Sequence, residues 1–160
     1  MINLKRTGAA VAAVAATAAL SALCACGNGG VVKVENDYGS DNYVLTVSGS
    51  VMQLADDTTL YDYLCALKED GEINFEAEQG DYGMYITSVE GVTQTNEGTS
   101  GYSWMIYTDL TELDGVTYSS ADYGTWGYDG KTLNSASYGV SGLPAVEGYT
   151  YALVYSYWSY

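Results

Sequence analysis

One stretch of this chain has the hydrophobic periodicity of a helix. Most of the remainder has the residue types of strands, so the fold must combine a single helix with several strands. Leu60, Leu64 and Leu67 recur at helical spacing on one face. The preceding residues 56–59, Asp-Asp-Thr-Thr, offer N-cap candidates, and Gly71 follows as a stop signal. The spacing predicts one short amphipathic helix over 60–67, with its leucine face packed on a sheet.

Runs rich in β-branched and aromatic residues lie on both sides of this helix and predict strands. Before it, residues 43–47 and 51–54 are separated by a short Gly-containing turn, which predicts a hairpin. After it come three further runs, residues 85–89, 102–107 and 149–160. A hairpin, one helix and then more strands is the element order of a β-grasp fold. We therefore predict an α+β, β-grasp-like fold with the helix packed on a mixed or antiparallel sheet.

Two other stretches have weaker patterns. Residues 27–42 are Gly-rich and then acidic, and predict a partly extended tether, so that ordered structure is expected to begin at Tyr43. Residues 114–148 contain many Gly, Ser, Tyr and Asp, and are long for a structureless connection. This stretch is expected either to contain short strands or to work as a binding loop.

The N-terminus has the layout of a secretory signal. Lys5 and Arg6 precede an apolar run over residues 8–23 that is too short for a stable membrane span. The run ends in Leu-Cys-Ala-Cys-Gly, which resembles a bacterial lipobox with Cys26 as the lipidated residue. The sequence predicts cleavage before Cys26 and a lipid anchor at the outer face of the cytoplasmic membrane. An ordinary signal peptide of a secreted protein is the alternative.

Removal of residues 1–25 leaves 135 of the 160 residues, which fits one domain. The predicted organisation is a signal peptide over 1–25, a lipidated cysteine and tether over 26–42, and a domain over 43–160. Of the 5 basic residues, Lys5 and Arg6 leave with the signal, and all 20 acidic residues stay, so the formal charge changes from −15 to −17. Nucleic acid and anionic lipid are therefore poor partners. The net negative charge is also explained by the need to stay soluble beside a negatively charged cell wall.

The residue inventory disfavours catalysis. The chain has no histidine, which removes His-dependent nucleophile arrangements and His-containing zinc sites. Two acidic stretches, residues 37–41 and 122–129, do not match a calcium-binding loop and are interpreted as solvated acids. The remaining cysteine of the mature body, Cys65, is predicted to be a buried apolar side chain. No cofactor and no metal site is predicted, and a hydrolase would need two converging carboxylates.

The aromatic residues are the candidate binding groups. The chain has 17 Tyr and 3 Trp but only 1 Phe, so aromatics with a polar tip predominate. Such rings provide a flat apolar platform with hydrogen-bonding groups at its rim, and they also cover half-buried strands. Trp104, in the middle of a strand, is expected in the core. The candidate ligand-binding residues are Tyr123, Trp126 and Tyr128 first, and then Tyr102, Tyr155 and Tyr157.

Four motifs together resemble the DUF4430 family: TTLYDYL at 58–64, YITSVEG at 85–91, YSWMIY at 102–107 and EGYTYALVY at 147–155. That family is similar to the C-terminal domain of transcobalamin and intrinsic factor, a β-grasp domain of the soluble-ligand-binding type. The resemblance covers most of residues 43–157. Two departures lie in loops: Thr-Asp-Leu at 108–110 replaces an Asn-Gly turn, and residues 118–134 look like an insertion.

The resemblance implies that this predicted lipoprotein carries a ligand-binding domain without enzymatic activity, with a cobalamin-like corrinoid as the ligand. The helical domain that holds most of the ligand in transcobalamin is missing here, so either this module binds weakly alone or a partner, a separate helical-domain protein or a transporter, completes the site. The alternative is an interaction or adhesion module that recognises protein or glycan through a Tyr-rich face. A flat exposed aromatic surface without a pocket would favour this alternative.

Overall fold

The computed structural model describes residues 30–160, which form three antiparallel sheets and one helix. The largest sheet has the strand order β1-β2-β12-β7-β11-β10, and β6 also pairs with β7. Its strands are β1 (Val32–Glu35), β2 (Asp41–Thr46), β6 (Thr95–Asn96), β7 (Ser100–Thr108), β10 (Ser119–Tyr128), β11 (Lys131–Ala136) and β12 (Thr150–Ser159). The smaller sheets contain β3 (Phe75–Gly80), β4 (Gly83–Val89) and β5 (Val92–Thr93), and β8 (Glu112–Leu113) with β9 (Val116–Thr117).

The helix, α1 (Leu60–Glu69), begins and ends at capping residues. Thr59 is the N-cap, and its hydroxyl accepts from the backbone N–H of Asp62, whose carboxylate accepts from the backbone N–H of Thr59, which is a capping box. At the other end, Gly71 has φ +74, and the N–H groups of Gly71 and Glu72 donate to the carbonyls of Lys68 and Leu67. The helix, its buried leucine face and its end at Gly71 are confirmed.

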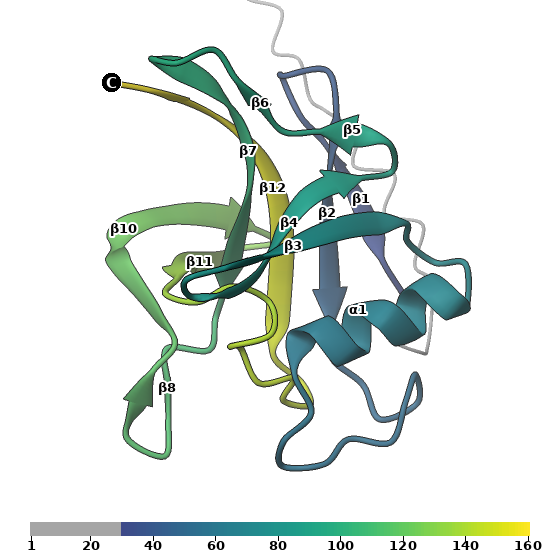
Figure 1. The fold of residues 1–160 in the computed structure, drawn as a ribbon. Coiled ribbons are helices and arrows are strands. Elements are labelled where there is room, and N and C mark those ends of the chain that lie inside the picture. Colours follow the sequence, from purple (N-terminus) through teal and green to yellow (C-terminus); the bar gives the residue numbers. More distant parts are fainter. Residues whose placement is uncertain (1–29) are drawn as a thin grey trace, which may run out of the picture.

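The central strand of the large sheet is β12, which is covered on both faces. Tyr151, Leu153 and Tyr155 point into the main core, where they meet α1, β3 and β4. Figure 1 shows α1 and the β3–β4 hairpin on the same side of β2, β12 and β7. Ala152 and Val154, on the alternate phase, point into a second core. Apolar residues in both phases are what a strand buried on both faces requires.

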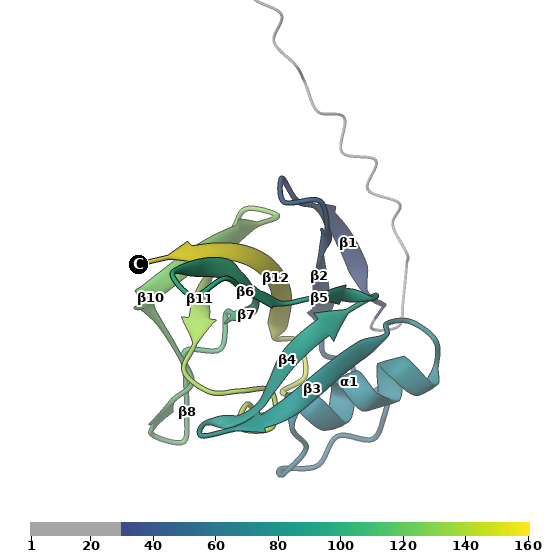
Figure 2. The same ribbon diagram turned by 45° about the horizontal axis from the view of Figure 1, so that its top comes forward.

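The second core forms because the sheet curls. Leu133 of β11 packs on Val44, Ala152 and Val154, and Trp126 and Tyr128 of β10 lie against the same group. In Figure 2, β10 and β11 lie on the side of β12 away from α1. A bulge between Ser120 and Thr125 interrupts the pairing of β10 with β11, and bulges increase the local bend of a strand. The long stretch 114–148 therefore contains strands, one of the two outcomes expected for it.

The α+β, β-grasp-like fold class is wrong. Of the described residues, 52% lie in strands and 8% are helical, all in the single helix, so the protein is a β-rich fold with several sheets. The sequence interpretation gave the helix too much weight and treated residues 118–134 as an insertion. These residues contain all of β10 and the first four of the six residues of β11, which extend the main sheet and cover its second face.

The hairpin predicted before the helix does not form. The strand expected over 43–47 is present as β2, but residues 51–54 are not a strand. Instead β2 pairs with β1, with Val32 opposite Val44 and Glu35 opposite Asp41. The sheet thus begins within residues 26–42, which the sequence interpretation assigned to the tether. The other predicted strands are confirmed as β4, β7 and β12.

Candidate functional site

The candidate aromatic residues lie on two opposite faces of the main sheet. Cross-strand pairing places Tyr102 of β7 opposite Tyr157 of β12, and Tyr155 lies on the same face two residues away. Trp126 and Tyr128 lie in strand β10 and pack over the other face. The structure therefore brings the candidates together as two separate groups rather than as one site.

The first group is a cluster of four tyrosines, Tyr38, Tyr102, Tyr155 and Tyr157, which we call the tyrosine cluster. The ring of Tyr102 is stacked on that of Tyr155, with centroids 5.2 Å apart and an interplanar angle of 12°. Its centroid lies 5.3 Å from that of Tyr157 and 5.6 Å from that of Tyr38. Tyr102 is thus the centre of the cluster, because it contacts each of the other three rings.

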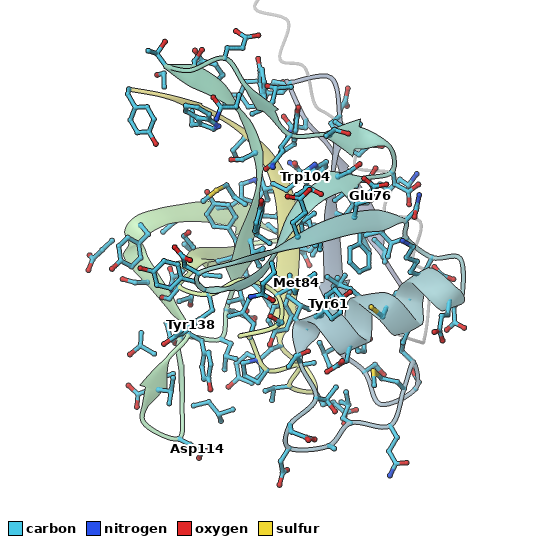
Figure 3. The ribbon with its side chains drawn as sticks, in the orientation of Figure 1. Tyr61, Glu76, Met84, Trp104, Asp114 and Tyr138 are labelled. Carbon is cyan, nitrogen blue, oxygen red and sulfur yellow. The ribbon has the colours of Figure 1, made fainter. Side chains whose placement is uncertain are left out.

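The cluster has a buried base and an open rim. Tyr155 is only 6% exposed, and its hydroxyl donates to the carbonyl of Thr93 at 3.1 Å. Tyr38 and Tyr157 are 51% and 48% exposed. Beneath the cluster, the ring centroid of Trp104 lies 5.0 Å from that of Tyr155, and the Trp104 indole N–H donates to the backbone carbonyl of Val92. Figure 3 shows the position of Trp104. Trp104 is buried in the main core, as expected, and gives the cluster a rigid support.

Burial raises the pKa of the Tyr155 hydroxyl, and the neighbouring Tyr102 adds to the increase. The same cause raises the pKa of Tyr43, with smaller contributions from the carboxylates of Asp41 and Glu90. These phenols stay protonated at neutral pH, so they act as neutral hydrogen-bond donors. At the base of the cluster, Tyr155 is therefore uncharged and its hydroxyl donates to the carbonyl of Thr93.

Sequence reasoning missed Tyr38. It lies in the turn between β1 and β2, in the segment interpreted as a tether, and only the pairing of these two strands brings it to Tyr102. The acidic residues around it, Glu35, Asp37 and Asp41, gave a signal for solvent exposure but none for contact with strands more than 60 residues away along the chain. Local composition could not have found this residue.

The second group lies within strand β10. The rings of Trp126 and Tyr128 are stacked at 5.9 Å with an interplanar angle of 6°, and burial raises the pKa of Tyr128, with a smaller contribution from Asp129. Both rings cover Val154 and its neighbours in the second core. Tyr123 lies at the bulge and is 71% exposed, apart from both groups.

Three surface depressions surround these elements. One of about 290 Å³ lies between the β1–β2 turn and β12, and its lining includes Glu35, Asp37, Tyr38, Trp126 and Tyr155. A second, of about 430 Å³, lies on the other side of the same turn and is lined by Glu35, Asp41, Tyr43 and Glu90 among others. The third, of about 470 Å³, is lined by residues 54–56, 58, 113–114 and 144–147 and contains none of the candidate residues. All three are open to solvent.

Cysteine and acidic side chains are the other groups of this chain that could form a site. Cys26, the predicted lipidation site, lies outside the described residues. Cys65 is half-buried in α1 against the main core and forms no disulfide. Within residues 30–160, no group of three or more Cys, Asp or Glu side chains is arranged to hold a metal ion. The two acidic stretches lie in the β1–β2 turn and in β10.

Comparison with protein-family models, curated proteins and solved structures finds no match for this chain. The resemblance to the DUF4430 family is not tested by these comparisons and stays a prediction. In the part of the chain that the structure describes, the helix is neither long nor apolar enough to cross a membrane.

Proposed function

We propose that this protein is a non-catalytic recognition module, held at the outer face of the bacterial cytoplasmic membrane by a lipid on Cys26. Its binding surface is the tyrosine cluster, and its partner is a protein or glycan at the cell surface. The observation that carries the proposal is the exposed rim of the cluster, Tyr38 and Tyr157, supported by the stacked pair Tyr102 and Tyr155. Half-exposed tyrosines on a rigid base are the groups that binding surfaces favour.

The choice of side chains supports this proposal. Apart from Val32 and Val116, the exposed large apolar side chains are all tyrosines: Tyr38, Tyr82, Tyr85, Tyr123, Tyr138, Tyr157 and Tyr160. Most of them are dispersed over the surface. Tyr38 and Tyr157 differ because both contact Tyr102 and therefore form one continuous aromatic area. A continuous exposed apolar area is typical of an interaction site, whereas isolated exposed apolar residues are ordinary.

The position of the cluster relative to the predicted anchor also supports it. The chain enters the sheet at Val32, and Tyr38 lies beyond the far end of β1, in the turn before β2. Five residues separate Cys26 from Val32, so a covalent tether reaches at most about 20 Å. A domain held this close to the lipid would present the β1–β2 turn, rather than the start of β1, away from the membrane.

A corrinoid is the second candidate ligand, through the DUF4430 resemblance, but the geometry favours a polymeric partner. Drug-sized ligands usually bind in pockets of about 300–1,000 Å³ that enclose most of their surface. The depression that contains Trp126 and Tyr155 has about 290 Å³ and is open. An open surface with aromatic rings suits a partner that lies across it better than a ligand that must be enclosed.

The proposal is tested with residues 26–160 carrying Cys26→Ser, which keeps every strand and the helix but removes the lipidation site. This protein is applied to an oligosaccharide array and to a display library of random peptides, and is titrated with cobalamin and cobinamide. We expect binding to sugars or peptides that falls about tenfold or more in the double variant Tyr38→Ala/Tyr157→Ala, the size of effect expected at a hot spot.

Tyr82→Ala is the matched control, because Tyr82 is an exposed tyrosine at the β3–β4 turn, outside the cluster. It should bind as the parent protein does. Binding of sugar or peptide that is unchanged in the double variant would contradict the proposed surface. Saturable binding of cobalamin or cobinamide, with no binding of polymers, would instead favour the corrinoid ligand.

A further inference from the structure

The edge of β12 next to β2 has free backbone groups at its C-terminal end. Strand β2 pairs with β12 only from Thr150 to Leu153. At Tyr155 two side chains replace the missing strand: Asn42 Oδ1 accepts from the Tyr155 N–H at 3.0 Å, and Asn36 Nδ2 donates to the Tyr155 carbonyl at 2.7 Å. The backbone groups of Tyr155 therefore point toward the β2 side of the strand.

In an antiparallel sheet the N–H and C=O of every second residue point to the same edge. The next backbone groups on the β2 side after Tyr155 thus belong to Tyr157 and Ser159. Within residues 30–160, no strand pairs with β12 on that side beyond Leu153, whereas β7 pairs with its other side as far as Ser159. A row of unpaired strand groups is a template for the addition of another strand.

The two faces beside this free edge differ in chemistry. On one face lies the tyrosine cluster, with the exposed rings of Tyr38 and Tyr157. Toward the other face opens the depression of about 290 Å³, whose lining extends from Tyr38 and Tyr155 of the cluster to Trp126 and the exposed acids Glu35 and Asp37. Its lining contains no basic residue. An aromatic face beside carboxylates is the environment that a guanidinium or ammonium group prefers.

We infer that an extended peptide segment of a partner protein adds to the free edge of β12, pairs with the backbone of Tyr157 and Ser159, and places an Arg or Lys side chain beside Trp126 and Asp37. Successive side chains of a strand alternate between faces, so one row of the peptide would lie on the tyrosine cluster and the other would reach the acidic depression. This inference rests on the proposed function and names its partner.

The net negative charge of the protein favours a basic peptide over a second copy of this chain at the free edge of β12. After removal of the signal, 20 acidic residues face three basic ones. A second copy of this chain would bring acidic surfaces together, which opposes pairing of two β12 edges across a two-fold axis. A basic peptide is attracted by the same charge. The occupant is therefore a basic segment of another protein.

The test uses seven-residue peptides of alternating threonine and valine with arginine, glutamate or norleucine at the centre. Each is titrated into ¹⁵N-labelled protein, residues 26–160 with Cys26→Ser. We expect the arginine peptide to bind about tenfold more tightly than the glutamate peptide and to shift the amide signals of Tyr157 and Ser159 and the indole signal of Trp126. Equal affinities for the arginine and glutamate peptides would overturn the inference.

A variant that lacks one backbone N–H of β12 distinguishes the addition of a peptide strand from simple contact with the rings of the tyrosine cluster. Ser159→Pro deletes an N–H that points to the free edge, so the pairing of β12 with β7 is kept. Ser159→Ala removes the same hydroxyl but keeps the N–H, and is the reference variant. We expect the arginine peptide to bind Ser159→Pro at least about fivefold more weakly than Ser159→Ala. Equal binding would overturn strand addition.

The acidic depression is tested by Asp37→Asn, which removes a charge at nearly the same size, and by Trp126→Leu, which removes the aromatic face but keeps an apolar side chain. Both should reduce binding of the arginine peptide about threefold or more and leave binding of the norleucine peptide nearly unchanged. Asp81→Asn, at an exposed acid in the β3–β4 turn, is the matched control for charge. Loss of binding by the same factor for both peptides would overturn the assignment of this depression to a basic side chain.

The outcomes for the inference and for the proposed function are distinct. If Tyr38→Ala/Tyr157→Ala weakens binding but Ser159→Pro equals Ser159→Ala, the tyrosine cluster is the binding surface and strand addition is wrong. If neither variant changes the binding of any peptide or oligosaccharide, both are wrong. Binding of oligosaccharides but of no peptide would keep the surface and overturn the peptide partner.

Discussion

At the level of single residues, two asparagines bind the backbone of β12 just beyond the point where its pairing with β2 stops. Asn42 is buried, and its side-chain oxygen accepts from the Tyr155 N–H and from Asn36 Nδ2, the latter at 2.7 Å. Asn36 Nδ2 also reaches the Tyr155 carbonyl. The two amides satisfy both backbone groups of Tyr155 on the side of β12 where no strand pairs with it, and a buried backbone group left unpaired costs free energy.

Asn42→Ala is expected to lower the free energy of unfolding by about 1–3 kcal/mol, because it leaves the Tyr155 N–H without an acceptor in a buried position. Denaturant unfolding followed by tryptophan fluorescence measures the change. Asn96→Ala is the matched control, since Asn96 is exposed and accepts only from the N–H of the nearby Gly98. Similar losses for the two variants would show that the buried amide pair has no special role.

At the scale of elements, the segment over residues 138–142 docks on strand β4. The N–H groups of Gly139 and Val140 donate to the carbonyls of Tyr82 and Met84, at 2.9 and 2.7 Å. Ser141 Oγ accepts from the Met84 N–H at 2.8 Å. Figure 3 shows Met84 near the end of the β3–β4 hairpin. These bonds join the small sheet to the connection between β11 and β12.

Gly139 permits this close approach, because a Cβ there would collide with the backbone carbonyl of Met84. Gly139→Ala is expected to destabilise the protein by about 1–3 kcal/mol through overpacking. Amide exchange should show faster opening of β4 than in the parent protein. Gly127→Ala is the control, since a Cβ at Gly127 meets only open space and an alanine in a strand is neutral or slightly stabilising. Equal stability of both variants would contradict this explanation.

At the scale of the whole molecule, the buried tyrosines link stability to alkaline pH. Burial raises the pKa of Tyr151 strongly, and that of Tyr63 and Tyr107 to a smaller extent. In the unfolded chain these phenols ionise near pH 10. A pKa raised by folding means that the stabilisation is complete below about pH 10 and is lost as the pH rises above it.

We therefore expect the urea midpoint to be constant from neutral pH to about pH 9 and to fall steeply above pH 10. Tyr151→Phe should be less stable at neutral pH, since it loses the hydrogen bond to the Pro144 carbonyl, but its midpoint should fall less at alkaline pH. Tyr123→Phe, at an exposed position, serves as the control. If the urea midpoint of Tyr151→Phe fell at alkaline pH as much as that of the parent protein, groups other than Tyr151 would cause the pH dependence.

The local features of this protein follow from short-range patterns in its sequence. The capping residues of α1, its leucine face and its end at Gly71 follow from interactions between residues close in the chain. The strands at β4, β7 and β12 follow from residue type, and the alternation along β12 separates the side chains of the two cores. Each of these depends on backbone geometry over a few residues, which the sequence specifies directly.

Which strands pair, and what their faces cover, depends on contacts that form only in the folded chain. The pairing of β1 with β2 brings Tyr38 to the tyrosine cluster, and the curl of the sheet brings Trp126 over Val154. The same alternating pattern is compatible with several partners and both faces, because the choice depends on contacts between residues far apart in the chain. The β-rich architecture and the free edge of β12 were therefore beyond the reach of local patterns.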